Sequence, residues 1–309
     1  MTGLEIVLEY LPKTIMYKIE PVLNVQKGQN RTGTKCPKCI EEIRLRTGKP
    51  LMIKTEQGME ILEHIVSQQE ILQAFERICE NSVYSYRRQI CDGYITIRGG
   101  NRVGVVGSAV IENGQVININ YISSLNFRIT RQKIGCSDFL LKDIINMQEK
   151  NIYNTLIISP PGCGKTTLLR DIIRNLSNGN KELDFEGKTV GIVDERGEIA
   201  AMYKGMPQND IGIRTDVIDN MPKAEGMKKL VRSMSPDIIA CDEIGGTDDI
   251  EAIDYIMCSG VKGIFTAHGK DINEINKNPD LSKLLCKHVF ERIILLNPLK
   301  RGDAKCIYL

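Results

Sequence analysis

The chain has 309 residues, of which 42% are hydrophobic and 26% charged, a length and composition typical of about two globular domains. Its 41 basic and 39 acidic residues leave a formal net charge of only +2, which argues against a strongly basic nucleic-acid-binding face or an acidic tail. No apolar stretch reaches the ~20 residues of a membrane-spanning helix, so we expect contact with a membrane only through a partner.

The ten cysteines are scattered singly, and the N-terminal residues show neither the basic start nor the apolar core of a signal peptide. Single cysteines fit a reducing compartment, so we expect a cytoplasmic protein. Cys36 and Cys39 form the one C-x-x-C pair. No second pair and no neighbouring histidine completes a zinc site, and the role of the two cysteines stays open.

The first half of the chain predicts a mixed α/β domain. Short strands are expected at 43–45 and 51–53, around a turn at 47–50. Ser67 and Glu70 form a capping box that predicts a helix, because apolar residues from 71 to 79 then recur on one helical face. Three further strands are expected at 94–98, 103–110 and 116–122, the last two joined by a hairpin turn at Asn113-Gly114.

The second half predicts a parallel sheet, because strands and helices alternate along it. Ser137 is expected to cap a helix that runs to about Lys150, and we place the domain boundary between residues 134 and 135. The expected strands are 155–158, 190–193, 238–241, 261–266, 292–296 and 305–309, and the expected helices are 166–176, 227–234 and 247–258. The predicted fold is therefore a RecA-like α/β P-loop NTPase domain (135–309) preceded by a smaller α/β N-terminal domain (1–134).

A glycine-rich loop lies between the first strand and the first helix of this second domain. It consists of Ser159, Pro160, Pro161, Gly162, Cys163, Gly164, Lys165, Thr166 and Thr167. Such a loop surrounds a phosphate with backbone N–H groups at a positive helix end. Lys165 is placed to reach the β and γ phosphates, and the Thr166 hydroxyl to ligate Mg²⁺. The loop predicts binding of ATP and Mg²⁺, although Ser159 stands where the P-loop pattern has glycine.

Two pairs of carboxylates follow apolar strands of the predicted sheet. Asp242 and Glu243 follow strand 238–241 in the Walker B arrangement, so we expect Asp242 to hold Mg²⁺ through water and Glu243 to polarise the attacking water. Asp194 and Glu195 follow strand 190–193. Glu195 therefore competes with Glu243 for the role of base, and an ion pair with Arg196 is its structural alternative.

Three other residues are candidates for the reaction. His268 ends a strand, where it is expected to sense the γ-phosphate; a purely structural role is the alternative. Arg128 and Arg131 precede the predicted ATPase domain. We expect one of them to complete the site of a neighbouring subunit as an arginine finger, and their alternative is a solvated strand position.

Several longer motifs carry a resemblance to a known family. They are 41–46, 99–104, 212–217, 222–227 and 232–237, the last followed by Asp242-Glu243-Ile244-Gly245. The chain resembles the stage III sporulation protein AA family from about residue 41 onward, while 26–40 looks like an addition. That family is similar to the ATPases of type II and type IV secretion systems and pilus motors, whose Asp-box and His-box would correspond to 194–195 and 266–268.

The resemblance implies a hexameric homo-oligomer in the mother-cell cytoplasm, held at the membrane by membrane-embedded components of a sporulation channel. We therefore predict a Mg²⁺-dependent ATPase that powers a channel complex between mother cell and forespore, with no nucleic acid as partner. Two alternatives stay open. One is a RecA-type nucleic-acid motor, against which the low charge and the 5% aromatic content argue. The other is a nucleotide-binding assembly scaffold with little turnover.

Overall fold

The computed structural model describes residues 3–28, 40–297 and 304–309, so Cys36 and Cys39 lie outside the described residues. The chain divides into two compact units, the first formed by Met1–Arg131 with Tyr203–Gln208 and the second by Gln132–Met202 with Asn209–Leu309. The predicted boundary at 134/135 lies close to this division. No helix in the described part of the chain is long and apolar enough to cross a membrane.

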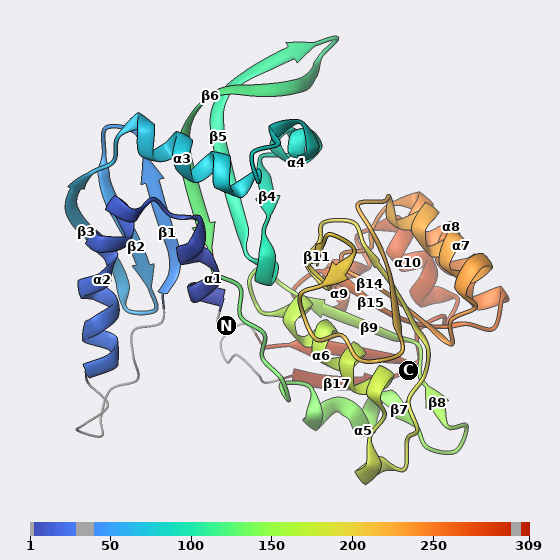
Figure 1. Ribbon diagram of the computed structural model, residues 1–309. Coiled ribbons are helices and arrows are strands. Elements are labelled where there is room, and N and C mark those ends of the chain that lie inside the picture. Colours follow the sequence, from blue (N-terminus) through green and yellow to red (C-terminus); the bar gives the residue numbers. More distant parts are fainter. Residues whose placement is uncertain (1–2, 29–39, 298–303) are drawn as a thin grey trace. The chain divides into compact units, whose positions relative to one another are not determined.

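The first unit is built on a six-stranded antiparallel sheet with the strand order β3-β2-β1-β6-β5-β4 (Figure 1). Its strands are β1 (Ile40–Arg46), β2 (Pro50–Thr55), β3 (Gly58–Ile65), β4 (Tyr94–Thr96), β5 (Arg102–Glu112) and β6 (Gln115–Arg128), and its helices are α1 (Gly3–Tyr10), α2 (Lys13–Gly28), α3 (Gln68–Ile78) and α4 (Arg87–Cys91). Alternate residues of β1 and β2, such as Ile43 and Ile53, are fully buried in one core with Val7 of α1 and Ile71 of α3. The sheet and these helices therefore share one apolar layer.

Two local predictions in this unit are confirmed. The capping box exists, because the Ser67 hydroxyl accepts the Glu70 N–H at 3.2 Å and the Glu70 carboxylate accepts the Ser67 N–H at 2.8 Å. The hairpin turn also exists, with Asn113 at φ +50° and Gly114 at φ +76° between β5 and β6. Both central residues have positive φ, which is the conformation that an Asn-Gly turn between strands provides.

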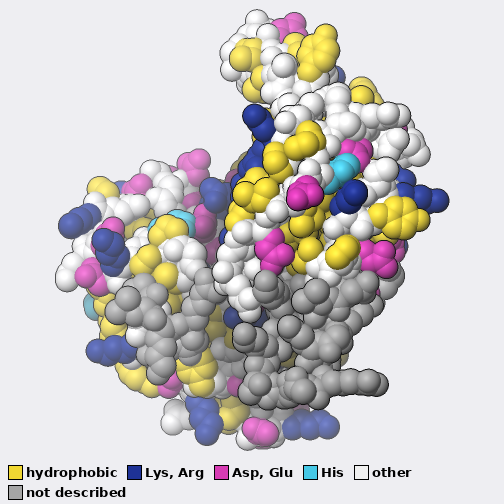
Figure 2. Space-filling view, turned by 90° about the vertical axis from the view of Figure 1, so that its left-hand side faces the viewer, with side chains coloured by type: hydrophobic (Ala, Val, Ile, Leu, Met, Phe, Trp, Pro, Cys, Tyr) yellow, Lys and Arg dark blue, Asp and Glu magenta, His cyan; other side chains and the backbone are white. Residues whose placement is uncertain are grey.

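Four of the helices and strands named for this unit were not predicted: α1, α2, α4 and β3. Strand β3 is the edge of the sheet, and its Met59, Ile61 and Ile65 are 44%, 64% and 55% exposed. Hydrophobic side chains stand among charged ones in Figure 2, which faces the side of Figure 1 where β3 lies. Because these apolar residues are exposed while polar Glu60 and His64 are partly buried, the strand lacks the alternation of buried apolar and exposed polar residues by which a half-buried strand is recognised.

The second unit contains a seven-stranded sheet with the order β13-β10-β14-β15-β9-β16-β17; Figure 1 labels β9, β14, β15 and β17 of this sheet. All neighbours pair in parallel except β16 and β17. The strands are β9 (Thr155–Ser159), β10 (Val190–Asp194), β13 (Thr215–Asp219), β14 (Ile238–Cys241), β15 (Lys262–His268), β16 (Arg292–Leu296) and β17 (Ala304–Tyr308), and the main helices are α6 (Lys165–Asn178), α7 (Lys223–Met234), α8 (Thr247–Cys258) and α10 (Pro279–Cys286). The α/β class and the parallel sheet are thus as predicted.

Helices cover both faces of this sheet, because alternate strand residues enter two different cores. Ile157 and Ile192 pack with Leu169 of α6 in one core, whereas Ile158 and Val193 belong to the other, with residues of α7, α8 and α10. Strands buried on both faces read as continuous apolar runs. This explains why six strands of this sheet were predicted, whereas β13, whose residues are only partly buried, was not.

The predicted helix from Ser137 to Lys150 is wrong. The structure has a short 3₁₀ turn (Asp138–Leu140), one helical turn in α5 (Leu141–Ile144) and then a small hairpin of β7 (Ile145–Asn146) and β8 (Asn151–Ile152). The Asn146 side chain accepts the N–H groups of Gln148 and Glu149 at 3.1 and 3.2 Å. This side-chain turn satisfies backbone donors that a helix would use, so the helix ends before it.

Gly226 marks a close approach of α7 to the sheet. A Cβ atom at this position would lie 2.6 Å from Cγ1 of Val193 on β10. We expect Gly226→Ala to lower the free energy of unfolding by about 1–3 kcal/mol through overpacking, although alanine favours the helix. Urea denaturation measures the change. The control is Ser233→Ala at an exposed position of the same helix, which should leave stability unchanged or slightly raised; an equal loss in both variants would contradict the packing argument.

Candidate functional site

The predicted phosphate-binding loop joins β9 to α6. Gly162 and Gly164 have φ values of +77° and +88°, a region in which residues with a Cβ are strained, so both glycines are required by the backbone. Ser159 is the last residue of β9, and its φ is not positive. The serine therefore departs from the P-loop pattern at a position where the backbone does not need glycine.

Lys165 is the first residue of α6, and its side chain is only 6% exposed. Its ammonium nitrogen lies 3.0 Å from Nδ1 of His268 and 3.8 Å from Oε1 of Glu243. Burial lowers the pKa of Lys165, and the nearby carboxylates of Asp242 and Glu243 oppose that effect. The lysine thus stands beside groups from the ends of two other strands.

The Asp242 carboxylate is held by two threonine hydroxyls, one on each oxygen. Thr166 of α6 donates to Oδ2, and Thr266 of β15 donates to Oδ1. The Thr266 hydroxyl also accepts the N–H of Glu243 at 2.9 Å. These bonds connect the start of α6 with the ends of β14 and β15, and they place the two predicted metal ligands, Thr166 and Asp242, side by side.

The Glu243 carboxylate lies at the centre of the charged groups. Oε1 accepts from Nε2 of His268 at 2.7 Å, and Oε2 accepts from the Arg196 guanidinium at 2.6 Å. Because Lys165 donates to Nδ1 of the histidine, the histidine proton that Glu243 accepts is carried on Nε2. Glu243 itself has a φ of +56°, a strained conformation of the kind found at functional sites.

Asp194 holds the loop that follows β10, a structural role that the sequence pattern did not indicate. Its buried carboxylate accepts the N–H groups of Glu198, Ile199 and Ala200 at 2.7 to 3.1 Å. Burial raises the pKa of Asp194, and these N–H donors oppose that effect. Asp194 therefore folds the loop that carries Glu195 and Arg196.

Glu195 and Glu243, the two rival bases, are both near Lys223 at the start of α7. The Lys223 ammonium lies 3.3 Å from the Glu195 carboxylate and donates to the backbone carbonyl of Glu243 at 2.8 Å. Together with Arg196 they line one narrow pocket. In this arrangement Glu243 contacts Lys165 and Glu195 does not, yet the roles of both stay predictions.

The two arginines predicted to act across a subunit boundary lie in the first unit. Arg128 is exposed at the end of β6, opposite Arg102 of β5. Arg131 donates to the Glu56 carboxylate at 3.4 Å and to the Ile40 carbonyl at 3.2 Å. Arg131 is thus bound within its own unit, and the finger role of either residue stays a prediction.

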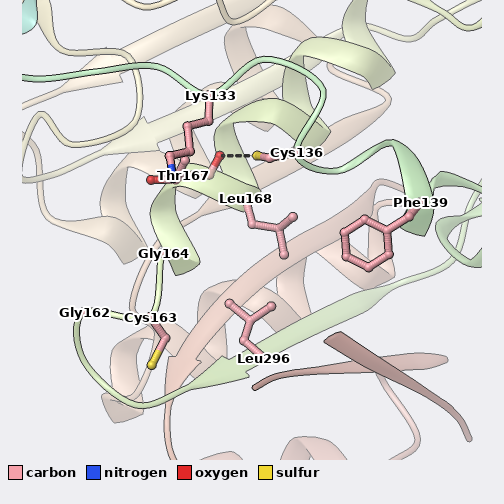
Figure 3. Close-up of a pocket in the computed structure, with 9 residues that line it drawn as sticks. All are labelled: Lys133, Cys136, Phe139, Gly162, Cys163, Gly164, Thr167, Leu168 and Leu296. Carbon is pink, nitrogen blue, oxygen red and sulfur yellow. Dashed lines mark hydrogen bonds between the residues drawn. The ribbon is translucent and has the colours of Figure 1, made fainter. Parts of the chain in front are cut away.

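A cavity of about 450 Å³ opens beside the phosphate-binding loop. Its lining consists of Lys133, Cys136, Phe139, Gly162, Cys163, Gly164, Thr167, Leu168 and Leu296. Figure 3 shows Phe139, Leu168 and Leu296 pointing toward one another from three different elements, with the loop glycines at one end. The cavity is of the size of small-molecule sites. Sequence patterns gave no sign of Phe139 or Leu296, because an apolar residue carries no signature of a binding wall.

The wall of this cavity near Cys136 is anchored to α6 by Asp171. The Asp171 carboxylate is 1% exposed and accepts the Ser137 N–H and hydroxyl, both at 2.8 Å, the Gly135 N–H at 3.1 Å and Arg174 Nε at 2.9 Å. Burial acts to raise the pKa of Asp171, but the bonds from Ser137, Gly135 and Arg174 outweigh it and hold the pKa below its usual value. The segment before Phe139 is therefore fixed to the helix that begins with Lys165.

Comparison with protein families shows to which family this chain belongs. The model of the family described as "Sporulation stage III, protein AA" matches residues 17–309. The "Stage III sporulation protein AA" of Bacillus subtilis (strain 168) is 40% identical over 270 residues, which cover 87% of this chain and 86% of that protein. The chain belongs to the stage III sporulation protein AA family. A second similar protein is "Uncharacterized protein ycf45" of Cyanidium caldarium. It is 34% identical over 167 residues, which cover 53% of this chain and 46% of that protein.

Solved structures show which fold the family member has. The Legionella pneumophila ATPase DotB has a TM-score of 0.57 at 15% identity, with 96% of this chain and 76% of DotB covered. The pilus retraction motor PilT with bound ADP has a TM-score of 0.57 at 14% identity, with 90% of this chain and 77% of PilT covered. At such identities the likeness establishes the fold of secretion and pilus ATPases.

Replacing Asp171 tests the anchor of the cavity wall. We expect Asp171→Asn to lower the free energy of unfolding by about 2–4 kcal/mol at pH 7, because buried donors lose a charged acceptor. The folded-state pKa lies below the unfolded value, so the contribution is present above about pH 4 and is lost as pH falls through the folded pKa. Urea denaturation across this pH range should show the two proteins converging in acid. Asp184→Asn, at an exposed position, is the control; a pH-independent difference for Asp171→Asn would contradict the assignment.

Proposed function

We propose that this chain is a Mg²⁺-dependent ATPase that forms a ring and powers a membrane channel complex during sporulation. The observation that carries the proposal is the convergence of Lys165, Thr166, Asp242, Glu243 and His268 from one helix and two strand ends at one point beside the phosphate-binding loop. Phosphoryl transfer requires positioning and charge more than covalent chemistry. A buried lysine next to a clamped carboxylate meets both requirements.

The donor set fits Mg²⁺. Thr166 and Asp242 offer hard oxygen atoms in direct contact, and Mg²⁺ in such sites binds one or two protein oxygens together with substrate phosphates and waters. No group of three or more His, Cys, Asp or Glu residues that could hold a metal occurs among the residues described. When bound, the ion offsets charge on the phosphates.

Glu243 is the better candidate for the base, because it adjoins Lys165, which P-loop sites direct at the terminal phosphates. It takes the proton of the attacking water and orients that water toward the γ-phosphorus. His268 lies 2.7 Å from the same carboxylate, so it is placed to respond when the charge near Glu243 changes. Glu195 stays the alternative base, held by Lys223.

The cavity beside the loop accommodates the nucleoside. Its phosphate end is lined by Gly162 and Gly164, and its other end by Phe139 and Leu296. An aromatic ring and an aliphatic side chain offer flat apolar contact to a base. The base therefore stacks against Phe139 while the phosphates turn into the loop.

The proposed oligomeric state and cellular location are inferred from similar proteins. The structural neighbours are titled as an ATPase and a pilus retraction motor, and the family carries its sporulation name. We therefore infer a homo-oligomeric ring, with six subunits as the expected number, in the mother-cell cytoplasm. It is held at the membrane by membrane-embedded channel components, and Arg128 or Arg131 completes the neighbouring site.

Replacing Glu243 tests the reaction. We expect Glu243→Gln to lower kcat for ATP by at least about 100-fold, because a general base contributes that much, and to leave ATP binding intact. Phosphate release and binding of a fluorescent ATP analogue measure the two quantities. Glu251→Gln on the exposed face of α8 is the control. If wild type and Glu243→Gln share one background rate, the chain is a nucleotide-binding scaffold.

Two further results of the same assay decide between alternatives. A loss of turnover in Glu195→Gln with full activity in Glu243→Gln assigns the base to Glu195. Clear stimulation of the wild type by single-stranded DNA or RNA contradicts the secretion-type motor and supports a nucleic-acid motor.

Replacing Phe139 tests the nucleoside pocket. We expect Phe139→Ala to raise KM for ATP about tenfold, since base stacking contributes on this order, and to change kcat by less than about twofold. Steady-state kinetics measure both. Ile213→Ala, an exposed apolar position, should change neither, and an unaltered KM in Phe139→Ala would place the base elsewhere.

A further inference from the structure

We infer that Arg196 is a catalytic residue that acts within its own subunit, by binding the γ-phosphoryl group of the nucleotide as that group is transferred. The inference rests on the proposed ATPase function and adds a residue to it. It differs from a finger supplied by Arg128 or Arg131 of a neighbouring subunit, because Arg196 belongs to the same compact unit as Lys165.

Arg196 lies close to the lysine that is placed to bind the terminal phosphates. Arg196 Nη1 lies 2.6 Å from Oε2 of Glu243, whereas Lys165 Nζ lies 3.8 Å from Oε1 of the same carboxylate. A single carboxylate thus separates the guanidinium from the ammonium that binds the terminal phosphates. Any γ-phosphoryl group that reaches Lys165 and faces a water on Glu243 also comes within the reach of the long Arg196 side chain.

The loop that carries Arg196 is held in place by buried side chains. Asp194 accepts three backbone N–H groups from 198–200, and buried Arg170 of α6 donates to the carbonyls of Ile199 and Glu198 at 2.7 and 2.5 Å. The backbone that carries Arg196 is therefore tied to the same helix that begins with Lys165. The Arg196 side chain, in contrast, is 61% exposed, so it can turn without disturbing a core.

The charged groups around Glu243 also favour this role for Arg196. Both oxygens of Glu243 are paired with cationic or proton-donating groups, Oε2 with Arg196 and Oε1 with His268. Each oxygen of Glu243 is therefore already in contact with a donor. When Arg196 turns away, Oε2 becomes available to the attacking water, and a planar guanidinium prefers phosphate oxygens as its bidentate partner.

In the proposed reaction, water attacks the γ-phosphorus and ADP is the leaving group. The oxygen of water forms a bond to the γ-phosphorus, the bond from that phosphorus to the β–γ bridging oxygen breaks, and ADP leaves with the bonding electron pair. The water proton passes to Glu243. Arg196 donates two N–H groups to the equatorial oxygens, where charge is spread in the transition state. The contact is stronger in the transition state than in the ground state, so it raises kcat rather than affinity.

Three variants test the inference on the full chain. We expect Arg196→Ala to lower kcat about 100- to 1,000-fold with a change in KM below about threefold. Arg196→Lys should restore little activity, because lysine lacks the planar fork. Arg232→Ala, at an exposed position on α7, should behave as wild type. Full activity of Arg196→Ala while Lys165→Ala is inactive would overturn the inference and leave the ATPase proposal standing; wild-type protein no more active than Lys165→Ala would refute the ATPase itself.

A transition-state analogue separates catalysis from structure. Arg196→Ala should bind ADP with Mg²⁺ as wild type does, but it should lose most of the additional affinity that aluminium fluoride gives to bound ADP. Unfolding by urea should show equal stability. A higher kcat in Arg196→Ala, or unchanged trapping with aluminium fluoride, would show that Arg196 only restrains Glu243.

Mixed oligomers separate action within a subunit from action across a boundary. Subunits with Arg196→Ala and subunits with Lys165→Ala are combined before assay. If Arg196 acts in its own subunit, every site in the mixture lacks one required group and turnover stays at the level of the separate variants. Recovered turnover would show that Arg196 serves a neighbour, which contradicts the inference.

Discussion

Parallel pairing of β10, β14, β15 and β9 is the constraint on which the candidate site depends. Parallel strands end at a common edge, and the register here pairs His268 with Ser159 and Cys241 with Phe265. Residues that directly follow these strand ends therefore meet, although they are separated by up to about a hundred positions in the chain. The crossover helices that parallel pairing requires also place the positive end of α6 at this edge. Hydroxyls of Thr166 and Thr266 then fasten Asp242 between them.

Much of this arrangement follows from sequence patterns, and the failures have identifiable physical reasons. Strands buried on both faces and a glycine-rich turn before a helix are local features, so the strands β9 and β14 and the loop before α6 could be predicted from the sequence. The path of a loop, in contrast, depends on contacts that a local sequence pattern does not contain. Asp194 was counted with Glu195 as a second carboxylate pair, but it binds the backbone N–H groups of its own loop. The partners of Arg196 and Lys223 depend on that path.

The predicted helix from Ser137 to Lys150 failed for a related reason. The prediction rested on Ser137 as an N-cap, but Asn146 accepts backbone donors that the helix needed. The short turn that forms instead allows Asp171 to hold Ser137 and Gly135 against α6. Phe139 then faces the cavity rather than continuing a helix. Hydrogen bonds made by single side chains, such as Asn146 and Asp171, thus determine the path of this segment.

The charges of the site are balanced by one another. Glu243 is paired with Arg196 and His268, Glu195 is paired with Lys223, and Lys165 is buried against Asp242 and Glu243. In the proposed ATPase, a triphosphate brings several negative charges to this group, where burial strengthens every charge interaction. The proposal therefore requires the cations to turn from carboxylates toward phosphates during the reaction and to return when phosphate leaves. Such a change of partners is how the proposed motor couples its nucleotide state to the position of the loop that carries Arg196.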